Sequence, residues 1–502
     1  MTSTDLGASD GVYISHDSPN TESGDNFLIM PLPRGARSRP VIQSRFKAAL
    51  VAPLIYVLSG CSAPRPTTAV APKSSCAIVP STSAPAESIT VAAATPIDHA
   101  HVAVPATAAE RLVFAQLYET LIDVNCDGQA YPGLASSWTT DATKTRVTLV
   151  IRDGARFWNG KPVVASDVVT AWRATDVRAV ESSPLARRMA DEAVVVDDRT
   201  LTVSLPDTAW LVLADPALAV YRPQYGTWAM GTGPYRVDLD TTAASRPLTL
   251  VPNGRGSAPR IIIRARSSTD PRDAIDAGAD LIVTDDPVAV SYAATRASLT
   301  TVPLPWTRTY AVAAPNLAPR AATVSMPWDA DNPALRVSLA RDAVHAEARA
   351  SEPPYWWTGI QGCTSASVTQ TIVSPSARHS TRIVYRRDDR IARDLAARLV
   401  AVGRGMTTAG LAAADFARAV QAGNELAYVL DVPRASLSPC HDLDELVSSV
   451  PWVVTGTPGG PAVESLIPLV DTRARAIVSR DRVSATIDWD GTIRISGAPR
   501  QP

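Results

Sequence analysis

Residues able to carry out chemistry are few and scattered in this chain. It has 502 residues, of which only six are histidines and five are cysteines. Asp98, His99 and His101 could ligate a metal, but three polar residues in one loop are more often solvated. The only Ser-x-x-Lys, Ser44 to Lys47, precedes an apolar run of the kind found in export signals. The sequence therefore predicts no enzymatic activity, no metal and no cofactor.

The first cysteine, Cys61, follows a pattern typical of exported proteins. A basic stretch over 34–47 contains no acidic residue, and residues 48–58 (AALVAPLIYVL) are apolar. This run is much shorter than the roughly 20 residues that span a bilayer. The ending Leu58-Ser59-Gly60-Cys61 resembles the bacterial lipobox, which implies a diacylated Cys61 on the outer face of the cytoplasmic membrane. Residues 1–60 are thus predicted to be a signal peptide, with a misassigned extension before Met30.

The other four cysteines favour disulfides in an oxidising compartment. Cys76, Cys126, Cys363 and Cys440 allow three pairings, and none has the C-x-x-C spacing of zinc or thioredoxin-like sites. We expect Cys76–Cys126 and Cys363–Cys440, because each pair then stays within one half of the chain.

Composition excludes several classes of protein. The 48 Lys and Arg nearly balance the 49 Asp and Glu, giving a formal net charge of −1. This balance argues against a strongly basic nucleic-acid binder. A hydrophobic share of 46% argues against a disordered chain and against a multispan membrane protein.

Helical and strand patterns alternate along the chain, which indicates an α/β fold. Residues 61–87, rich in Ala, Pro, Ser and Thr, are predicted to be a flexible tether after the lipidated cysteine. Strands are predicted over 88–92, 145–151, 200–205, 260–266, 280–284 and 427–430, and a hairpin over 482–495. Helices are predicted over 110–124, 165–173, 270–277, 332–350 and 391–402.

Several segments, in order, resemble one family, the solute-binding proteins of ABC importers, family 5, which includes oligopeptide-, dipeptide- and nickel-binding members. The matching segments are FAQLYETL (114–121), DG and PGLASSW (127–138), IRDGARFWNGKP (151–162), ASDV (165–168), GTGPY (231–235), AIDAGADL (274–281) and NPALRVSLARDA (332–343). In GTGPY, glycine permits unusual backbone angles and Pro234 fixes φ, so a rigid turn between strands is expected. Trp138, Phe157 and Trp172 are expected to be core aromatics.

The resemblance implies a two-lobed, type II periplasmic-binding-protein-like fold with mixed sheets and a hinge crossed twice. Mapped onto this sequence, lobe I comprises 88–265 and the C-terminal return 460–502, and lobe II comprises 266–459. It implies a monomer that makes and breaks no bond. Such a protein captures a solute, oligopeptides above all, and delivers it to ABC permease and ATPase subunits; no nucleic acid is involved.

The resemblance also suggests ligand-binding residues. Peptide binders pair an aspartate with the peptide ammonium, and Asp431 in LAYVLDVPRASL (426–437) could match, although the family's tryptophan and second acid are missing. Asp431 is therefore either that anchor or an ordinary turn residue. The remaining candidates are Tyr118, Trp306, Arg308, Tyr355, Trp356 and Trp357, for which core packing is the alternative. Several of the family's ligand-side motifs are eroded in this sequence. The alternative function, a degenerate scaffold that acts as a surface sensor or as a protein-binding lipoprotein, therefore stays open.

Overall fold

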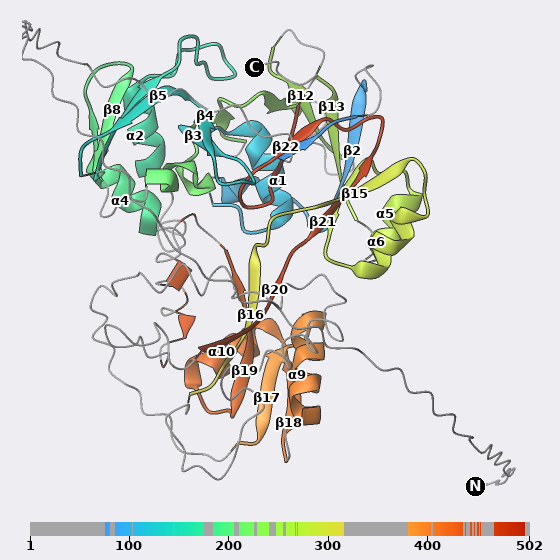
Figure 1. Cartoon of the computed structure of the whole chain (residues 1–502). Coiled ribbons are helices and arrows are strands. Elements are labelled where there is room, and N and C mark those ends of the chain that lie inside the picture. The colour runs from blue at the N-terminus through green and yellow to red at the C-terminus, as the bar shows by residue number, and fades with distance from the viewer. Residues whose placement is uncertain are drawn as a thin grey trace, which may run out of the picture. The chain divides into compact units, whose positions relative to one another are not determined.

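The computed structural model describes the chain from residue 76 to residue 496, with gaps of which the longest are 175–183, 205–209, 240–246, 316–379 and 453–465. The fold is mixed α/β, as predicted, and its larger sheets have seven, five and four strands (Figure 1). Within the described ranges no helix is long and apolar enough to cross a membrane.

The four-stranded sheet is antiparallel, in the order β5-β6-β8-β7. Its strands are β5 (Ala135–Thr140), β6 (Arg146–Ile151), β8 (Thr200–Ser204) and β7 (Ala193–Val195). Alternate residues Val147, Leu149 and Ile151 are buried, as expected for a sheet with one covered face. Helices α2 (Ala165–Arg173) and α4 (Pro184–Glu192) contact this sheet. The aromatics Trp138, Phe157 and Trp172 are buried, which confirms them as core residues.

The seven-stranded sheet has the order β11-β12-β13-β2-β14-β21-β15. Its strands are β11 (Tyr235–Val237), β12 (Leu248–Pro252), β13 (Arg260–Ala265), β2 (Ser88–Ala93), β14 (Leu281–Thr284), β21 (Arg475–Ser479) and β15 (Leu299–Pro303). Strand β2 pairs in parallel with both β13 and β14, and the other pairs are antiparallel. Helices α5 (Pro271–Asp276) and α6 (Pro287–Ala294) pack on each other beside it (Figure 1).

The five-stranded sheet carries separate apolar clusters on its two faces. Its order is β18 (Thr407–Leu411), β17 (Arg382–Arg386), β19 (Ala427–Pro433), β16 (Arg308–Ala313) and β20 (Leu466–Thr472). Alternate residues face opposite ways, so Tyr310 and Val312 pack with helix α9 (Arg390–Val402). Ala311 and Ala313 join the cluster that contains Val420 of helix α10 (Ala413–Ala422).

Shorter strands and helix α1 (Ala108–Leu117) complete the part of the protein that contains the four-stranded and the seven-stranded sheet. Helix α1 leads into the hairpin β3 (Ile122–Val124) and β4 (Ala130–Pro132). The prediction of a helix to residue 124 is therefore wrong, because Tyr118 is extended at the C-cap and β3 follows. The predicted C-terminal hairpin is confirmed as β22 (Ala485–Ile487) and β23 (Ile493–Ile495), joined to β1 (Ala77–Ile78). Strands β9 (Tyr221–Arg222) and β10 (Met230–Gly231) form a small pair.

The chain passes twice between the seven-stranded and the five-stranded sheet. One crossing is 304–307, between β15 and β16, and the other is 473–474, between β20 and β21. The sequence placed the lobe boundaries at 265/266 and 459/460, which the strand pairing contradicts. Strands β14 and β15 are hydrogen-bonded into the same sheet as β2 and β13, and β20 pairs with β16. Below, lobe I denotes the seven- and four-stranded sheets with the C-terminal hairpin, and lobe II the five-stranded sheet.

Candidate ligand site at the sheet crossing

Three polar side chains gather where β16 begins, directly after the first crossing. Tyr310 and Asp431 are direct partners in the antiparallel β16–β19 ladder, and Arg308 lies two residues before Tyr310. Residues two apart on a strand share a face, so all three lie toward the α9 side of the sheet. The Tyr310 hydroxyl donates to the Asp389 carboxylate at 3.1–3.2 Å, and Asp389 in turn accepts from Ala392 N in the first turn of α9.

Asp431 is a largely buried carboxylate held next to a cation. Arg308 Nε lies 3.0 Å from Asp431 Oδ1, yet Oδ1 has no hydrogen-bond partner among the described residues. Burial raises the pKa of Asp431, the Arg308 charge opposes this, and Asp389 adds to it. The Asp431 side chain is 19% exposed and that of Arg308 is 41% exposed. The sequence therefore identified a carboxylate in a special environment, but not its partner within the chain.

Arg308 also faces a carboxylate from the other lobe. Its Nη1 lies 3.8 Å from Oδ2 of Asp285, which follows β14 in the seven-stranded sheet. Burial alone would lower the pKa of Arg308, but attraction to Asp431, Tyr310 and Asp285 outweighs it, so the pKa is raised. Arg308 thus stays charged and is shared between lobes I and II.

Trp306, another candidate, lies in the first crossing and contacts the second. The guanidinium carbon of Arg473 is 4.4 Å from the centre of the Trp306 ring. A second contact of this kind joins Arg434, directly after β19, to Trp489 of the C-terminal hairpin at 5.1 Å. Cations at this distance are attracted to aromatic faces. Trp306 is therefore placed to stabilise the crossing.

Tyr118 does not present itself to a ligand in this structure. It is 3% exposed, packs edge-on against Phe114 and Tyr221, and stacks on Trp158. Its hydroxyl donates to Ala229 O at 3.3 Å, and burial raises its pKa. The structure thus supports the alternative of core packing for Tyr118.

The GTGPY turn packs against the end of α1, next to Tyr118. A Cβ on Gly231 would lie 2.0 Å from Leu117 O, and one on Gly233 would lie 2.5 Å from Gln116 O. Neither glycine is among the described residues with positive φ. The expectation that these glycines supply unusual backbone angles is therefore wrong; they are needed because another backbone approaches closely.

A small cavity in lobe I lies beside a polar cluster that sequence reasoning missed. Its volume is about 30 Å³, enough for one or two water molecules rather than a peptide. Polar lining residues are Arg111, Thr120, Asp488, Thr492 and Arg494.

The cluster is built around Arg494 of β23. Its guanidinium lies 2.8 Å from Asp123 Oδ1 and 2.5 Å from Asp488 Oδ2. Burial raises the pKa of Asp488 to about 7, with Arg494 opposing and Asp123 adding to the shift. In the sequence Asp488 and Arg494 lie in a predicted hairpin and Asp123 in a predicted helix, where charged residues are usually solvated, so no signal distinguished them.

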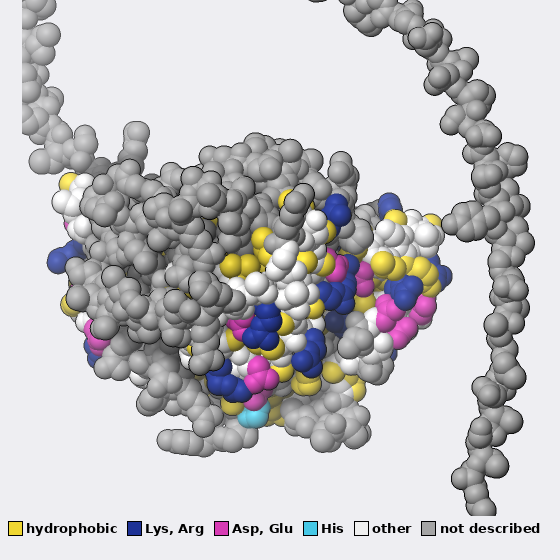
Figure 2. All heavy atoms as spheres, turned by 90° about the horizontal axis from the view of Figure 1, so that it is seen from below, with side chains coloured by type: hydrophobic (Ala, Val, Ile, Leu, Met, Phe, Trp, Pro, Cys, Tyr) yellow, Lys and Arg dark blue, Asp and Glu magenta, His cyan; other side chains and the backbone are white. Residues whose placement is uncertain are grey.

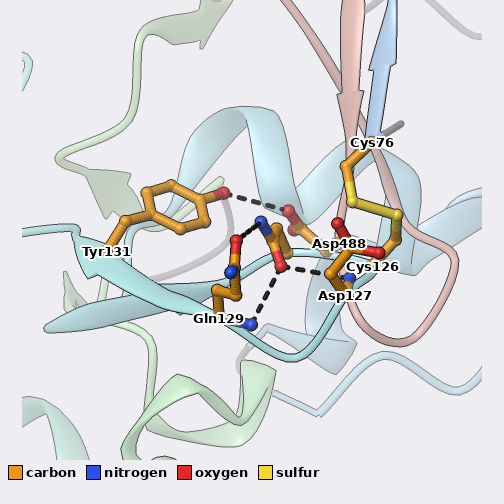
Figure 3. The surroundings of a disulfide bond; sticks show 7 residues. Cys76, Cys126, Asp127, Gln129, Tyr131 and Asp488 are labelled. Carbon is orange, nitrogen blue, oxygen red and sulfur yellow. Dashed lines mark hydrogen bonds between the residues drawn. A yellow bond between two sulfur atoms is a disulfide. The ribbon is translucent and has the colours of Figure 1, made fainter. Parts of the chain in front are cut away.

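The predicted Cys76–Cys126 disulfide is present and joins residues 50 apart in sequence. Figure 3 shows it beside the turn 125–129, where Asn125 Oδ1 accepts from Asp127 N and Gln129 N. Tyr131 donates to Asp488 Oδ1 at 3.3 Å on the other side of this turn (Figure 3). The bond therefore ties the first described residue to lobe I.

The described residues give little support for a metal site. In the described part of the chain the one group close enough is Cys76, Cys126 and Asp127, whose sulfurs are bonded to each other. His101 Nδ1 lies 3.0 Å from the buried Glu110 carboxylate, and Asp98 N donates to it. His101 thus serves an internal hydrogen-bond network, whereas His99 packs near Trp228 with ring centres 5.8 Å apart.

Several predicted residues lie outside the described residues. They are Cys61, Tyr355, Trp356, Trp357, Cys363 and Cys440, as well as the predicted helix over 332–350.

Charges of both signs are interspersed on the described part of the surface seen in Figure 2, in keeping with a net charge of −1. On that part of the face no broad area of a single sign is visible (Figure 2).

Part of the chain is similar in sequence to known proteins. Residues 129–258 match the model of the bacterial extracellular solute-binding proteins, family 5 Middle. The oligopeptide-binding protein OppA of Bacillus subtilis (strain 168) is 32% identical over 127 residues. That alignment covers 22% of this chain and 23% of OppA, so it spans about a quarter of the curated relative.

Solved structures match over a larger share of the chain. The dipeptide-binding protein from Pseudoalteromonas sp. SM9913, in complex with Met-Leu, has a TM-score of 0.54 at 13% identity, covering 82% of this chain and 100% of that one. The Escherichia coli murein tripeptide binding protein MppA has a TM-score of 0.53 at 14% identity, over 81% and 98%. NikA from Brucella suis, in complex with Fe(III)-EDTA, has a TM-score of 0.52 at 16% identity, over 78% and 95%.

At these low identities, the TM-scores above 0.5 show a shared fold alone. The segment matched by the family model contains the IRDGARFWNGKP and GTGPY motifs. The predicted resemblance is therefore confirmed: the chain is similar in sequence to the bacterial extracellular solute-binding proteins, family 5, over residues 129–258, and it shares the fold of solved peptide-binding proteins over about four-fifths of its length.

Proposed function

We propose that this protein is an extracytoplasmic solute-binding protein that captures oligopeptides between its two lobes and delivers them to an ABC importer. The observation that carries the proposal is Asp431, a largely buried carboxylate beside the crossing whose Oδ1 lacks a hydrogen-bond partner among the described residues. Such an oxygen can accept a hydrogen bond from the ammonium of a peptide, which would offset the cost of its burial.

The ligand class is supported by relatives and by local charge. OppA is named as an oligopeptide-binding protein, and another relative of the same fold was solved with Met-Leu. Among the described charges that act on Arg308 and Asp431, the carboxylates of Asp285, Asp389 and Asp431 outnumber the cations Arg308 and Arg386. A surplus of negative charge favours a ligand with an ammonium group over an anionic one.

The proposal includes a lipid anchor and transport partners. Cys61 would carry the lipid, and the fold would dock on ABC permease and ATPase subunits as a monomer. The tether to the outer face of the cytoplasmic membrane would be residues 62–75, shorter than the predicted 61–87, because Cys76 is buried and disulfide-bonded to lobe I. Support comes from the lipobox-like LSGC ending and from the disulfide after the tether, which suits an oxidising compartment. Metabolic labelling with a fatty acid, lost in Cys61→Ser, tests the anchor.

Thermal unfolding of the purified protein with a pool of di- to pentapeptides tests the ligand class. A ligand at 100 times its Kd adds about 2.7 kcal/mol of stability, which raises Tm by a few degrees in a protein of this size. We expect this shift to disappear in Asp431→Asn and to persist in Asp415→Asn, which alters an exposed carboxylate of α10 paired with Arg418. An equal shift in wild type and Asp431→Asn would contradict the role of Asp431.

One observation favours a second function, a degenerate scaffold that acts as a surface sensor or binds a partner protein. Arg308 already lies beside Asp431, in the place that the ammonium of a ligand would take, as could happen in a site that has lost its ligand. A protein whose Tm responds to no peptide, to no nickel and to no haem, and whose gene lies apart from permease and ATPase genes, would support this alternative.

A further inference from the structure

Arg308 stands between two carboxylates that belong to different lobes. Its Nε lies 3.0 Å from Asp431 Oδ1 within lobe II, and its Nη1 lies 3.8 Å from Asp285 Oδ2 in lobe I. It is the first residue of β16, directly after the crossing 304–307. Any movement of this side chain therefore changes the charge contacts between the two lobes.

The contact between Arg308 and Asp431 is of a kind that can be exchanged. It lacks the hydrogen-bond alignment of a tight arginine–carboxylate pair, since Asp431 Oδ1 has no hydrogen-bond partner among the described residues. The Arg308 side chain is 41% exposed, so solvent and solutes can reach it. Asp285, at 54% exposure, is open to a closer approach by the guanidinium.

The surrounding groups keep the site acidic when the arginine moves. Asp431 is affected by Asp389, Asp285 and Arg386, as well as by Arg308. Of these, Asp389 accepts from Tyr310 and Ala392 N, and Arg386 Nε is paired with Asp388 Oδ1 at 2.9 Å. Arg308 is the cation that lies against Asp431, so its departure opens this carboxylate to an incoming ammonium.

We infer that Arg308 is an internal counter-ion of Asp431, which yields the carboxylate to the ammonium of a bound peptide and then pairs with Asp285 across the crossing. This inference rests on the proposed function and specifies how the site is regulated. Peptide binding then breaks one ion pair within lobe II and strengthens one between lobes. A peptide with a blocked amino terminus cannot trigger this exchange.

The test compares a pool of tripeptides with free amino termini and the same pool N-acetylated, using the concentration that gives half the maximal Tm shift. We expect Arg308→Gln to bind the free-amine pool about fivefold more tightly, because a partly exposed ion pair contributes a free energy of this size. The affinity for the acetylated pool should not change. Arg382→Gln is the matched control, because Arg382 lies in the same sheet and pairs with Glu425 instead. It should leave both pools unchanged.

Asp285→Asn tests the second half of the exchange. We expect weaker binding of the free-amine pool, by a factor of about two to five, and no such effect when Arg308→Gln is also present. Equal effects of Asp285→Asn in both backgrounds would overturn the transfer to Asp285. Unchanged or weaker binding of free-amine peptides by Arg308→Gln would overturn the counter-ion role.

The proposed function fails by different results. If the wild-type protein binds neither pool, the peptide site itself is contradicted and the inference fails with it. The same holds if Asp431→Asn binds the free-amine pool as tightly as wild type does. Loss of binding in Asp431→Asn without the expected gain in Arg308→Gln leaves the peptide site standing and overturns only the counter-ion.

Discussion

At the scale of single residues, small changes of type have large effects where the chain packs tightly. Gly231 ends β10 against the last turn of α1, and the space for any side chain there is taken by backbone. Asp488 lies among Arg494, Asp123 and Tyr131, where the protein replaces water around a carboxylate. Neither residue is proposed to touch a ligand, yet both maintain lobe I.

Gly231→Ala is expected to destabilise the protein strongly. The new methyl group would lie 2.0 Å from Leu117 O and 2.6 Å from the Trp158 ring, so the GTGPY turn or α1 must move. We expect a loss of about 3 kcal/mol in the free energy of unfolding, measured by urea denaturation. Gly254→Ala is the control, because nothing lies within 4 Å of its added Cβ; its change should stay within about 0.5 kcal/mol.

Asp488→Asn is expected to change how stability depends on pH. Burial raises the pKa of Asp488 from 3.8 to about 7, so the folded state keeps a proton that the unfolded chain releases above pH 4. The stabilisation is complete below pH 4 and is lost as pH rises towards 7. The stability of wild type minus that of Asp488→Asn should therefore fall with pH, by up to about 1.4 kcal/mol per unit.

Denaturation in urea at pH 4.5, 5.5 and 6.5 measures this difference. Asp197→Asn serves as the comparison, since backbone hydrogen bonds lower the pKa of Asp197 and its difference should not fall over this range. A wild-type-minus-Asp488→Asn difference that stays level or rises would show that Asp488 is ionised in the folded protein throughout.

At the scale of elements, strand pairing is short where the described chain begins. Strand β1 pairs through only Ala77 and Ile78 with β22, which is too short to hold by itself. The disulfide from Cys76 to Cys126 anchors this strand to the turn after β3. It therefore fixes the point where the proposed tether would meet lobe I.

The double substitution Cys76→Ser with Cys126→Ser is expected to lower the free energy of unfolding by about 2–4 kcal/mol, because it frees a loop of 50 residues in the unfolded chain. Denaturation without reductant measures this loss. Hydrogen exchange should rise first at β1 and β22. Unaltered stability together with unaltered exchange would show that pairing with β22 suffices.

At the scale of the whole molecule, the two crossings decide how the described parts are connected. The chain enters lobe II through 304–307 and leaves through 473–474, so two short segments join separate apolar cores. Trp306 with Arg473, and Arg308 with Asp285, place aromatic and charged contacts at these segments. The residues proposed to pair with the charge of the ligand are thus next to those that connect the two lobes, which is why the proposed site lies here.

Much of this architecture follows from the sequence by itself. The runs rich in β-branched and apolar residues at 145–151 and 260–266 predict strands, the spacing of apolar residues at 391–402 predicts a helix, and Asp490-Gly491 predicts the hairpin; all are present. These signals are local, because burial of one face imposes a period of two or 3.6 on neighbouring residues. The family resemblance rests on equally local motifs and is confirmed over 129–258.

Tertiary structure alone decided which distant residues meet. Periodicity identifies a strand but not its neighbours, so the sequence placed β14 and β15 in the wrong lobe. The pairing of Arg308 with Asp431 joins strands far apart in the chain, and that of Asp123 with Arg494 joins β3 to β23 near the other end of the described chain. A charged residue looks solvated until its partners are known, because the cost of burying it depends on groups that only the folded sheet order brings within reach.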